Sequence, residues 1–296
     1  MKSTTADVAQ DVFHDFLSPI PDGSIIHDNG CGLSEAIRGY KQTFATPIGY
    51  AYPIERMVVE ATDIDPAMLK KAREYHDRNR WPVMRFSNMP AEQLSFPDDY
   101  FTHSISNFLI FMTKNDGVDC AKEIYRTLQP GGKAAITAWA TMPHGKAIDD
   151  VHRALRGEGA ERMYVMPAKW WKASHLKSVM QQGGFAEEDV TMETRPVYLR
   201  MEEEELRSQA ETLWGLRGAP KGGWTMADQE NWDKAIDMLV ERLKVRSTEN
   251  LIANPPPTRD RSSYESRMWT TQGGAAFELV AHVAVCRKSK PAVACM

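Results

Sequence analysis

The sequence predicts an α/β fold in which helices cover both faces of a mostly parallel sheet. From about residue 24 to residue 139, short runs of β-branched residues alternate with longer helical segments, a rhythm typical of βαβ units. The first of these runs leads directly into two closely spaced glycines. After residue 140 the pattern becomes mainly helical, and a late strand-like run closes it. These observations predict a sheet with a helical lid inserted before its last strand.

The first half of the chain carries five expected strands and three expected helices. The strands are expected at residues 25–28, 57–63, 83–87, 101–108 and 134–139, and the helices at residues 34–44, 66–78 and 116–128. Asp65 followed by Pro66 favours a helix start, because aspartate caps free N–H groups and proline needs no partner there. The last of these helices places Cys120, Ile124 and Leu128 on one face, which indicates a core face.

The second half is expected to be helical with two further strands. Helices are expected at residues 146–156, 168–182, 202–214 and 228–246, and strands at residues 190–199 and 277–286. A turn at residues 129–132, which contain two glycines, is expected to lead into the fifth strand. The predicted organisation is an N-terminal helix or lid element at 1–20, a ligand-binding core at 21–200, a helical lid at 201–271, and the last strand with the tail at 272–296.

Composition excludes several classes of function. The 296 residues carry a net charge of only −4 and are 42% hydrophobic, so no strong field is available to bind nucleic acid or an anionic membrane. The cysteines show no metal-ligand spacing, and they are Cys31, Cys120, Cys286 and Cys295. No uncharged apolar run approaches the ~18 residues of a membrane span. We therefore expect a cytoplasmic, metal-free protein that is a monomer or a homodimer.

The most informative stretch runs from the first strand through Asp28, Asn29, Gly30, Cys31 and Gly32 into a helix. Glycines at this place let the backbone approach a ligand closely. A glycine pair alone also fits a dinucleotide site. However, a carboxylate just before the glycines would repel a pyrophosphate, whereas S-adenosylmethionine brings an ammonium and a sulfonium. The charge pattern therefore favours the cationic cofactor S-adenosyl-L-methionine.

The second strand ends at Asp63, where a carboxylate can accept two hydrogen bonds from a ribose diol. NAD would use such a residue equally well, so Asp63 predicts a nucleoside site without selecting the cofactor. Ile64 follows it and is expected to pack on an adenine face.

Four motifs together resemble the class I, UbiE- and methyltransferase-11-type S-adenosylmethionine methyltransferases over about residues 20–140. They are the glycine loop at 28–32, the ribose segment at 62–69, the segment 89–98 that is similar to DAExLPF-PD, and the E-x-x-R-x-L-x-P-G-G signature at 123–132. The sequence of residues 101–108 resembles the corresponding segment of fungal secondary-metabolism members of this class.

This resemblance implies a Rossmann-like, seven-stranded sheet and a cofactor set on these residues. The usual aspartate of the DAExLPF motif is replaced by Pro90, which would pass adenine recognition to Asn88 or to the backbone near Met89. The expected cofactor-binding residues are Asp28, Asn29, Gly30, Cys31, Gly32, Asp63, Ile64, Met68, Asn88, Met89 and Asn107.

The catalytic candidates are His144, Asn107 and Phe108. His103 lies within a strand and reads as a structural histidine, whereas His144 is expected in the loop after the fifth strand and is the better candidate base. Asn107 and Phe108 end the fourth strand of the sheet, where they are expected to shape the space around the transferring methyl group.

The favoured function is methyl transfer by in-line displacement to an oxygen, nitrogen or sulfur of a small, secondary metabolite. Two alternatives stay open: a protein that uses the bound cofactor or the pocket for a non-methylating rearrangement or cyclisation, and a catalytically silent regulatory relative. An NAD-dependent reductase fits least, because Asp28 precedes the glycines.

Overall fold

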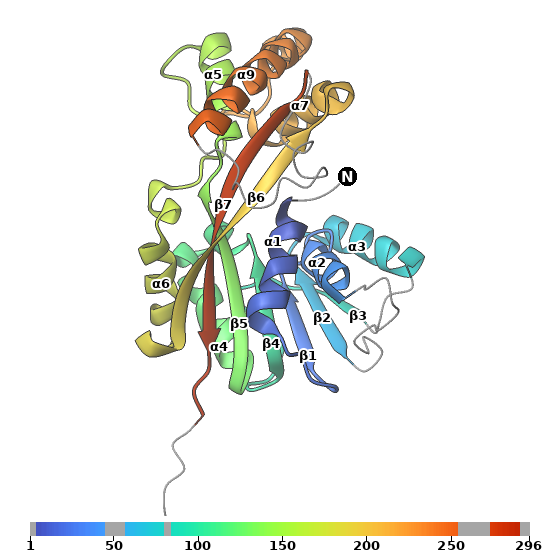
Figure 1. Cartoon of the computed structure of the whole chain (residues 1–296), viewed down its shortest axis with the longest axis vertical. Helices are drawn as coiled ribbons and strands as arrows, with labels where there is room; N and C mark the ends of the chain where they lie inside the picture. Colours follow the sequence, from blue (N-terminus) through green and yellow to red (C-terminus); the bar gives the residue numbers. More distant parts are fainter. Residues whose placement is uncertain (1–3, 45–56, 80–83, 254–272, 291–296) are drawn as a thin grey trace, which may run out of the picture. The chain divides into compact units, whose positions relative to one another are not determined.

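The computed structural model describes residues 4–44, 57–79, 84–253 and 273–290. Seven strands form one sheet in the order β3-β2-β1-β4-β5-β7-β6 (Figure 1). They are β1 Ile25–Asn29, β2 Val58–Asp63, β3 Met84–Asn88, β4 Phe101–Asn107, β5 Leu128–Thr141, β6 Val190–Met201 and β7 Ala275–Arg287. The pairs β1/β2, β1/β4, β2/β3 and β4/β5 are parallel. The predicted α/β class and mostly parallel sheet are therefore confirmed.

Five α-helices accompany the strands in the first part of the fold. They are α1 Thr4–Val12, α2 Glu35–Phe44, α3 Pro66–Asn79, α4 Val118–Thr127 and α6 Ala173–Gln182, with a π-helix at Phe13–Leu17. Helices α1 and α2 pack together on one face of the sheet, and α4 and α6 pack together on the other (Figure 1). Gly39 permits the first contact, because a Cβ there would collide with the carbonyl oxygen of Ala6 in α1.

The remaining helices are α5 His144–Arg156, α7 Glu203–Arg217, α8 Met226–Glu230 and α9 Trp232–Ala253. The chain divides into two compact units. The first consists of Met1–Ala140, Ala168–Arg195 and Ala281–Met296, and the second of Thr141–Pro167 and Pro196–Val280. Residues 254–271 of the predicted lid lie outside the described residues, as do residue 83 and Cys295.

Helix α5 joins the second unit, although the predicted boundaries place it in the core at 21–200. Its apolar residues Ile148 and Val151 are buried, and it packs against α9 and α7. The Asp150 carboxylate also accepts two hydrogen bonds from Arg246 Nη2, at 3.0 and 2.8 Å. These contacts link residues about a hundred positions apart, which sequence spacing does not reveal.

Two local predictions are wrong. Residues 129–132 do not form a separate turn ahead of the fifth strand, because they lie within β5. They form an irregularity there, where the pairing with β4 shifts register between Phe101/Leu128 and His103/Lys133. Gly131 has φ +86° there, and its N–H donates to Lys288 O at 2.6 Å. His144 is the first residue of α5 instead of a loop residue, because Pro143 already has helical backbone angles.

None of the helices in the described part of the chain combines the length and apolarity needed to cross a membrane.

Candidate active site

The carboxyl ends of three parallel strands bring most of the predicted cofactor residues to one edge of the sheet. Asn29 of β1 pairs with Thr62 of β2, and Asp63 of β2 pairs with Asn88 of β3. Ligands bind at this edge in open α/β sheets, where the strand order reverses. The order β2-β1-β4 places that reversal beside β1. The glycine loop that follows β1 therefore lies where the fold predicts a ligand.

Both glycines of this loop have left-handed backbone angles, with φ +69° at Gly30 and +52° at Gly32. The N–H of Cys31 donates to Thr62 O at 2.8 Å, which ties the loop to β2. A Cβ at Gly32 would meet no atom within 4 Å, whereas a Cβ at Gly30 would lie 2.5 Å from Leu109 Cδ2. One glycine thus faces open space, and the other makes room for a side chain.

The Asp63 carboxylate holds the loop in place. Its Oδ2 accepts a hydrogen bond from Gly32 N at 2.9 Å, and its Oδ1 accepts one from Asp65 N at 2.9 Å. Each carboxylate oxygen has a second lone pair. The predicted ribose ligand is therefore fixed by the backbone of its neighbours and keeps acceptor capacity for a diol.

Asp28 is the residue whose environment points most strongly to a ligand. Its side chain is buried, and Oδ2 has no hydrogen-bond partner among the described residues. Burial raises the pKa of Asp28 to about 8, and the charges of Asp63 and Glu35 add to the rise. A buried carboxyl without a partner is unfavourable unless a cation or donor joins it. The site therefore fits a ligand that brings positive charge, as S-adenosylmethionine does.

Asn88 and Met89 stabilise the end of β2. Asn88 Nδ2 donates to Asp63 O at 2.9 Å and to Ile64 O at 3.0 Å, and Met89 N donates to Asp63 O at 3.2 Å. Ile64 is 66% exposed and Met68 is 38% exposed. Two large apolar side chains thus lie uncovered beside the ribose position, as a planar base would require.

Asn29 and Cys31 turn toward the protein interior. Asn29 Nδ2 donates to Cys120 Sγ at 3.7 Å, and its Oδ1 accepts from Thr62 Oγ1 at 3.4 Å. Cys31 is buried, and burial raises the pKa of its thiol well above the ordinary range. The backbone of both residues, and not their side chains, is therefore available to a ligand.

Asn107 uses both ends of its amide within the protein. Nδ2 donates to Thr5 O of α1 at 3.0 Å, and Oδ1 accepts from Thr137 Oγ1 at 3.0 Å. Phe108 has φ +58°, donates its N–H to the same hydroxyl at 2.8 Å, and stacks on Trp139 with ring centroids 4.0 Å apart. The two predicted catalytic residues therefore form a rigid end to β4.

His144 belongs to the second unit, whereas every predicted cofactor residue belongs to the first. Its ring is buried, lies 6.0 Å from the Phe277 ring, and has no hydrogen-bond partner for Nδ1 among the described residues. Burial, with the positive charge of Arg217, lowers the pKa of His144 to about 4. Burial lowers the pKa of His103 to about 4 as well. Both rings are thus neutral and weakly basic at pH 7.

Sequence reasoning missed three residues around the loop: Leu109, Glu35 and Thr5. Leu109 packs on Gly30, and the Thr5 hydroxyl donates to the Glu35 carboxylate, whose charge acts on Asp28. An acidic residue in the first turn of a helix and an apolar residue after a strand are too common to signal a site. Only the tertiary contacts identify them.

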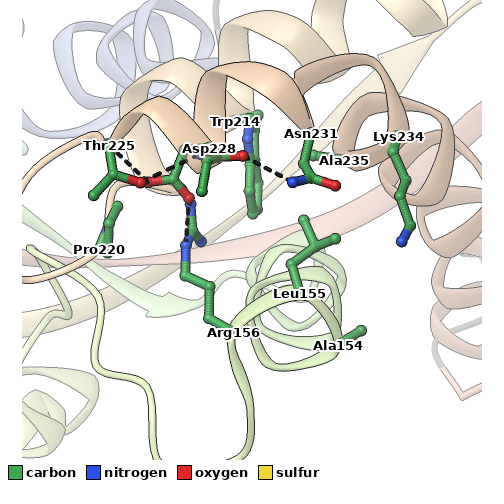
Figure 2. A pocket seen from close by; sticks show the side chains of 11 residues that line it. Ala154, Leu155, Arg156, Trp214, Pro220, Thr225, Asp228, Asn231, Lys234 and Ala235 are labelled. Atoms are coloured by element: carbon green, nitrogen blue, oxygen red, sulfur yellow. Dashed lines mark hydrogen bonds and ion pairs between the residues drawn. The ribbon is translucent and has the colours of Figure 1, made fainter.

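The second unit contains a cavity of about 300 Å³ between the end of α5 and the junction of α8 and α9 (Figure 2). Its lining combines Leu155, Trp214 and Pro220 with three alanines and the polar side chains of Asn231 and Lys234. Small side chains on facing helices leave this volume open, which reaches the lower end of small-molecule pockets.

Arg156 fixes one wall of this cavity. Its Nε donates to Asp228 Oδ1 at 2.8 Å (Figure 2). Its guanidinium lies over the rings of Trp214 and Trp224, 5.2 and 5.6 Å from their centroids. Asp228 also completes a capping box with Thr225 at the start of α8. This wall of the cavity is therefore held in place by the ion pair of Arg156 with Asp228 and by the tryptophan rings beside the guanidinium.

The described part of the chain contains no group of three or more side chains suited to hold a metal ion.

Comparison with known proteins agrees with this geometry. Residues 28–136 match the methyltransferase domain family. Methyltransferase tpcH of Aspergillus fumigatus is 22% identical over 184 residues, an alignment that covers 60% of this chain and 63% of the relative's length.

Solved structures share the fold. Phosphoethanolamine N-methyltransferase 2 of Haemonchus contortus, in complex with phosphomonomethylethanolamine and S-adenosylhomocysteine, has a TM-score of 0.51 at 17% identity, covering 96% of this chain and 53% of that one. The cyclase SpnF has a TM-score of 0.52 at 12% identity, covering 97% of this chain and 80% of that one. Residues 28–136 are thus similar to the methyltransferase domain family, and the chain has the fold of these solved structures.

Proposed function

We propose that this protein transfers a methyl group from S-adenosylmethionine to an oxygen, nitrogen or sulfur atom of a small molecule. The observation that carries the proposal is the buried, unpartnered carboxyl of Asp28 beside an open glycine loop. A dinucleotide pyrophosphate would be repelled there, whereas an ammonium or sulfonium would be attracted.

Around that carboxyl, the chain offers a partner for each part of the cofactor. Asp63 offers lone pairs to the ribose diol, Ile64 and Met68 offer exposed apolar surface to the base, and Gly32 offers open space for close approach. Asn88 and Met89 hold the end of β2 that carries Asp63. These roles rest on the contacts described above.

Positioning is the proposed source of rate acceleration. S-adenosylmethionine supplies a methyl group that its sulfonium charge already activates, so alignment and exclusion of water matter more than a strong base. Asn107 and Phe108 support this view, because their hydrogen bonds and stacking make a rigid wall at the end of β4. A pKa of about 4 makes His144 a weak base at pH 7.

A small acceptor, bound by residues of the helical second unit, is part of the proposal. The cavity beside Trp214 supports it, since its volume suits a compact organic molecule.

A second candidate is a non-methylating cyclisation in which the fold only positions a substrate. The cyclase SpnF has the same fold, and this likeness supports the second candidate. The two candidates differ in product mass, because only a methyltransferase adds a methyl group and releases S-adenosylhomocysteine.

The test is mass spectrometry of the protein incubated with methyl-labelled S-adenosylmethionine and a metabolite extract. The proposal expects a labelled small-molecule product and S-adenosylhomocysteine, both lost in Asp63→Ala. A product of unchanged mass would support the cyclase, and the absence of cofactor binding in calorimetry would reject the methyltransferase.

A further inference from the structure

The segment that follows β4 carries an unusual cluster of left-handed residues. Asn115, Asp116 and Gly117 have φ +48°, +53° and +83° in succession. Two consecutive non-glycine residues in this region are uncommon, although Asn and Asp tolerate it better than other side chains. Such a conformation persists only where surrounding contacts hold it, and it gathers near functional sites.

The Asp116 carboxylate provides the contacts that hold this segment. Trp170 Nε1 donates to Oδ1 at 3.1 Å, while Lys169 Nζ and His175 Nε2 lie 2.6 and 3.1 Å from Oδ2. Trp170 is 1% exposed, so its indole N–H has been taken out of water and needs this acceptor. The carboxylate thus anchors the segment to the 3-10 helix Ala168–Trp171 and to α6.

Gly117 lets the anchor fit closely. A Cβ at Gly117 would lie 2.9 Å from Ile110 Cγ1 and 3.1 Å from Trp170 Cη2. Ile110 is fully buried and begins the 3-10 helix Ile110–Met112. The anchor at Asp116 and the start of this short helix therefore pack as one piece.

The other end of that piece touches the glycine loop. Leu109 precedes Ile110, and its methyl groups fill the space where a Cβ of Gly30 would be, at 2.5 and 2.7 Å. Its carbonyl accepts a hydrogen bond from Met112 N at 2.8 Å, so the position of Leu109 follows that of the short helix. A continuous packing path thus links Asp116 to Gly30.

We propose that Asp116 is a positioning residue that seats Leu109 against Gly30 and so sets the glycine loop for the cofactor. The inference rests on the proposed cofactor site. In this proposal Asp116 affects the glycine loop only through Leu109. A substitution of Asp116 should therefore change cofactor affinity only when the Leu109 side chain is present.

A double-mutant cycle tests this dependence, with the dissociation constant for S-adenosylhomocysteine measured by calorimetry. Asp116→Gly relaxes the backbone and removes the anchor, and we expect it to weaken binding on the order of fivefold or more. Leu109→Ala should weaken binding comparably. In the Leu109→Ala background, Asp116→Gly should change affinity less than about twofold while still lowering the melting temperature.

Three further variants sharpen the result. Asp116→Asn keeps the left-handed tolerance and an acceptor for Trp170, so it should restore most of the affinity. Trp170→Phe removes the N–H donor together with part of the buried ring. Its effect on affinity should also vanish in Leu109→Ala, which keeps the test valid if Asp116→Gly does not fold. Asp119→Asn removes a carboxylate near the same segment that contacts Asn115 and Lys122 instead, and should leave affinity unchanged.

The positioning role would be overturned if the effects of Asp116→Gly and Leu109→Ala on affinity were additive. It would also be overturned if Asp116→Gly lowered the melting temperature but left affinity unchanged. Neither result would contradict the proposed function. If the unmodified protein binds no S-adenosylhomocysteine, the proposed function itself fails, and the positioning role fails with it.

Discussion

The buried carboxyl of Asp28 opposes folding when it ionises, a cost that the proposed cofactor would offset. The folded protein raises its pKa from an unfolded value of about 4 to about 8. The native state therefore binds a proton more tightly than the unfolded state, and stability from this group is present below about pH 4 and lost as the pH rises toward 8. This direction is opposite to that of a carboxylate paired in the native state.

Replacing Asp28 by Asn tests that cost. Asparagine keeps the shape but cannot ionise, so the cofactor-free variant should be more stable than the unmodified protein at pH 8, by more than about 1 kcal/mol, and equally stable near pH 4. Thermal unfolding between pH 4 and 8 measures the difference. The same variant should bind S-adenosylmethionine more weakly, and parallel stability curves for the two proteins would contradict the buried charge.

Cofactor binding should release the proton that Asp28 holds. At pH 7 the carboxyl of the free protein is mostly protonated, and a bound cation lowers its pKa. Calorimetry of S-adenosylhomocysteine in two buffers of different ionisation enthalpy should therefore report a released proton near pH 7 and none well above pH 8. Asp28→Asn corrects for titration of the ligand's own amino group, and equal proton release from both proteins would reject the assignment.

At the scale of elements, the sequence predicts most of the fold because periodicity and turn residues are local. Helix α3 begins at Pro66 as expected, and β2 and β4 end within one residue of their predicted ends. Backbone hydrogen bonds join Gly131 and Gly132, in the irregular part of β5, to Lys288, and the contact of Asn107 with Thr5 spans 102 residues. Such long-range partners set the site's geometry, and no local pattern encodes them.

Asn107 links β4 to helix α1, so Asn107→Ala should loosen that helix. Its loss leaves Thr5 O and the Thr137 hydroxyl without this partner, at a cost of about 1–3 kcal/mol. Hydrogen exchange should speed up at the amides of α1 more than at those of α4. Gln182→Ala is the matched control, because it removes an exposed amide that donates to Ser178 within α6. Equal protection of α1 in both variants would show that Asn107 does not hold it.

At the scale of the whole molecule, the proposed cofactor site and the cavity beside Trp214 belong to different compact units. The predicted cofactor residues all belong to the first unit, whereas the cavity beside Trp214 and the buried His144 belong to the second. Strands β6 and β7 contribute residues to both units. Substitutions in the second unit should therefore separate acceptor recognition from cofactor binding.

Filling the cavity of the second unit tests this separation. Ala227 lines the cavity and is exposed, so Ala227→Trp adds a large side chain there without opening the core. If the acceptor binds in the cavity, the variant should lower kcat/KM for the acceptor about tenfold or more, with the cofactor dissociation constant changed less than about twofold. Gln229→Trp places the same side chain on an exposed position of α8 outside the cavity and should leave both quantities unchanged. A variant that keeps acceptor kinetics but loses cofactor affinity would reverse the roles assigned to the two units.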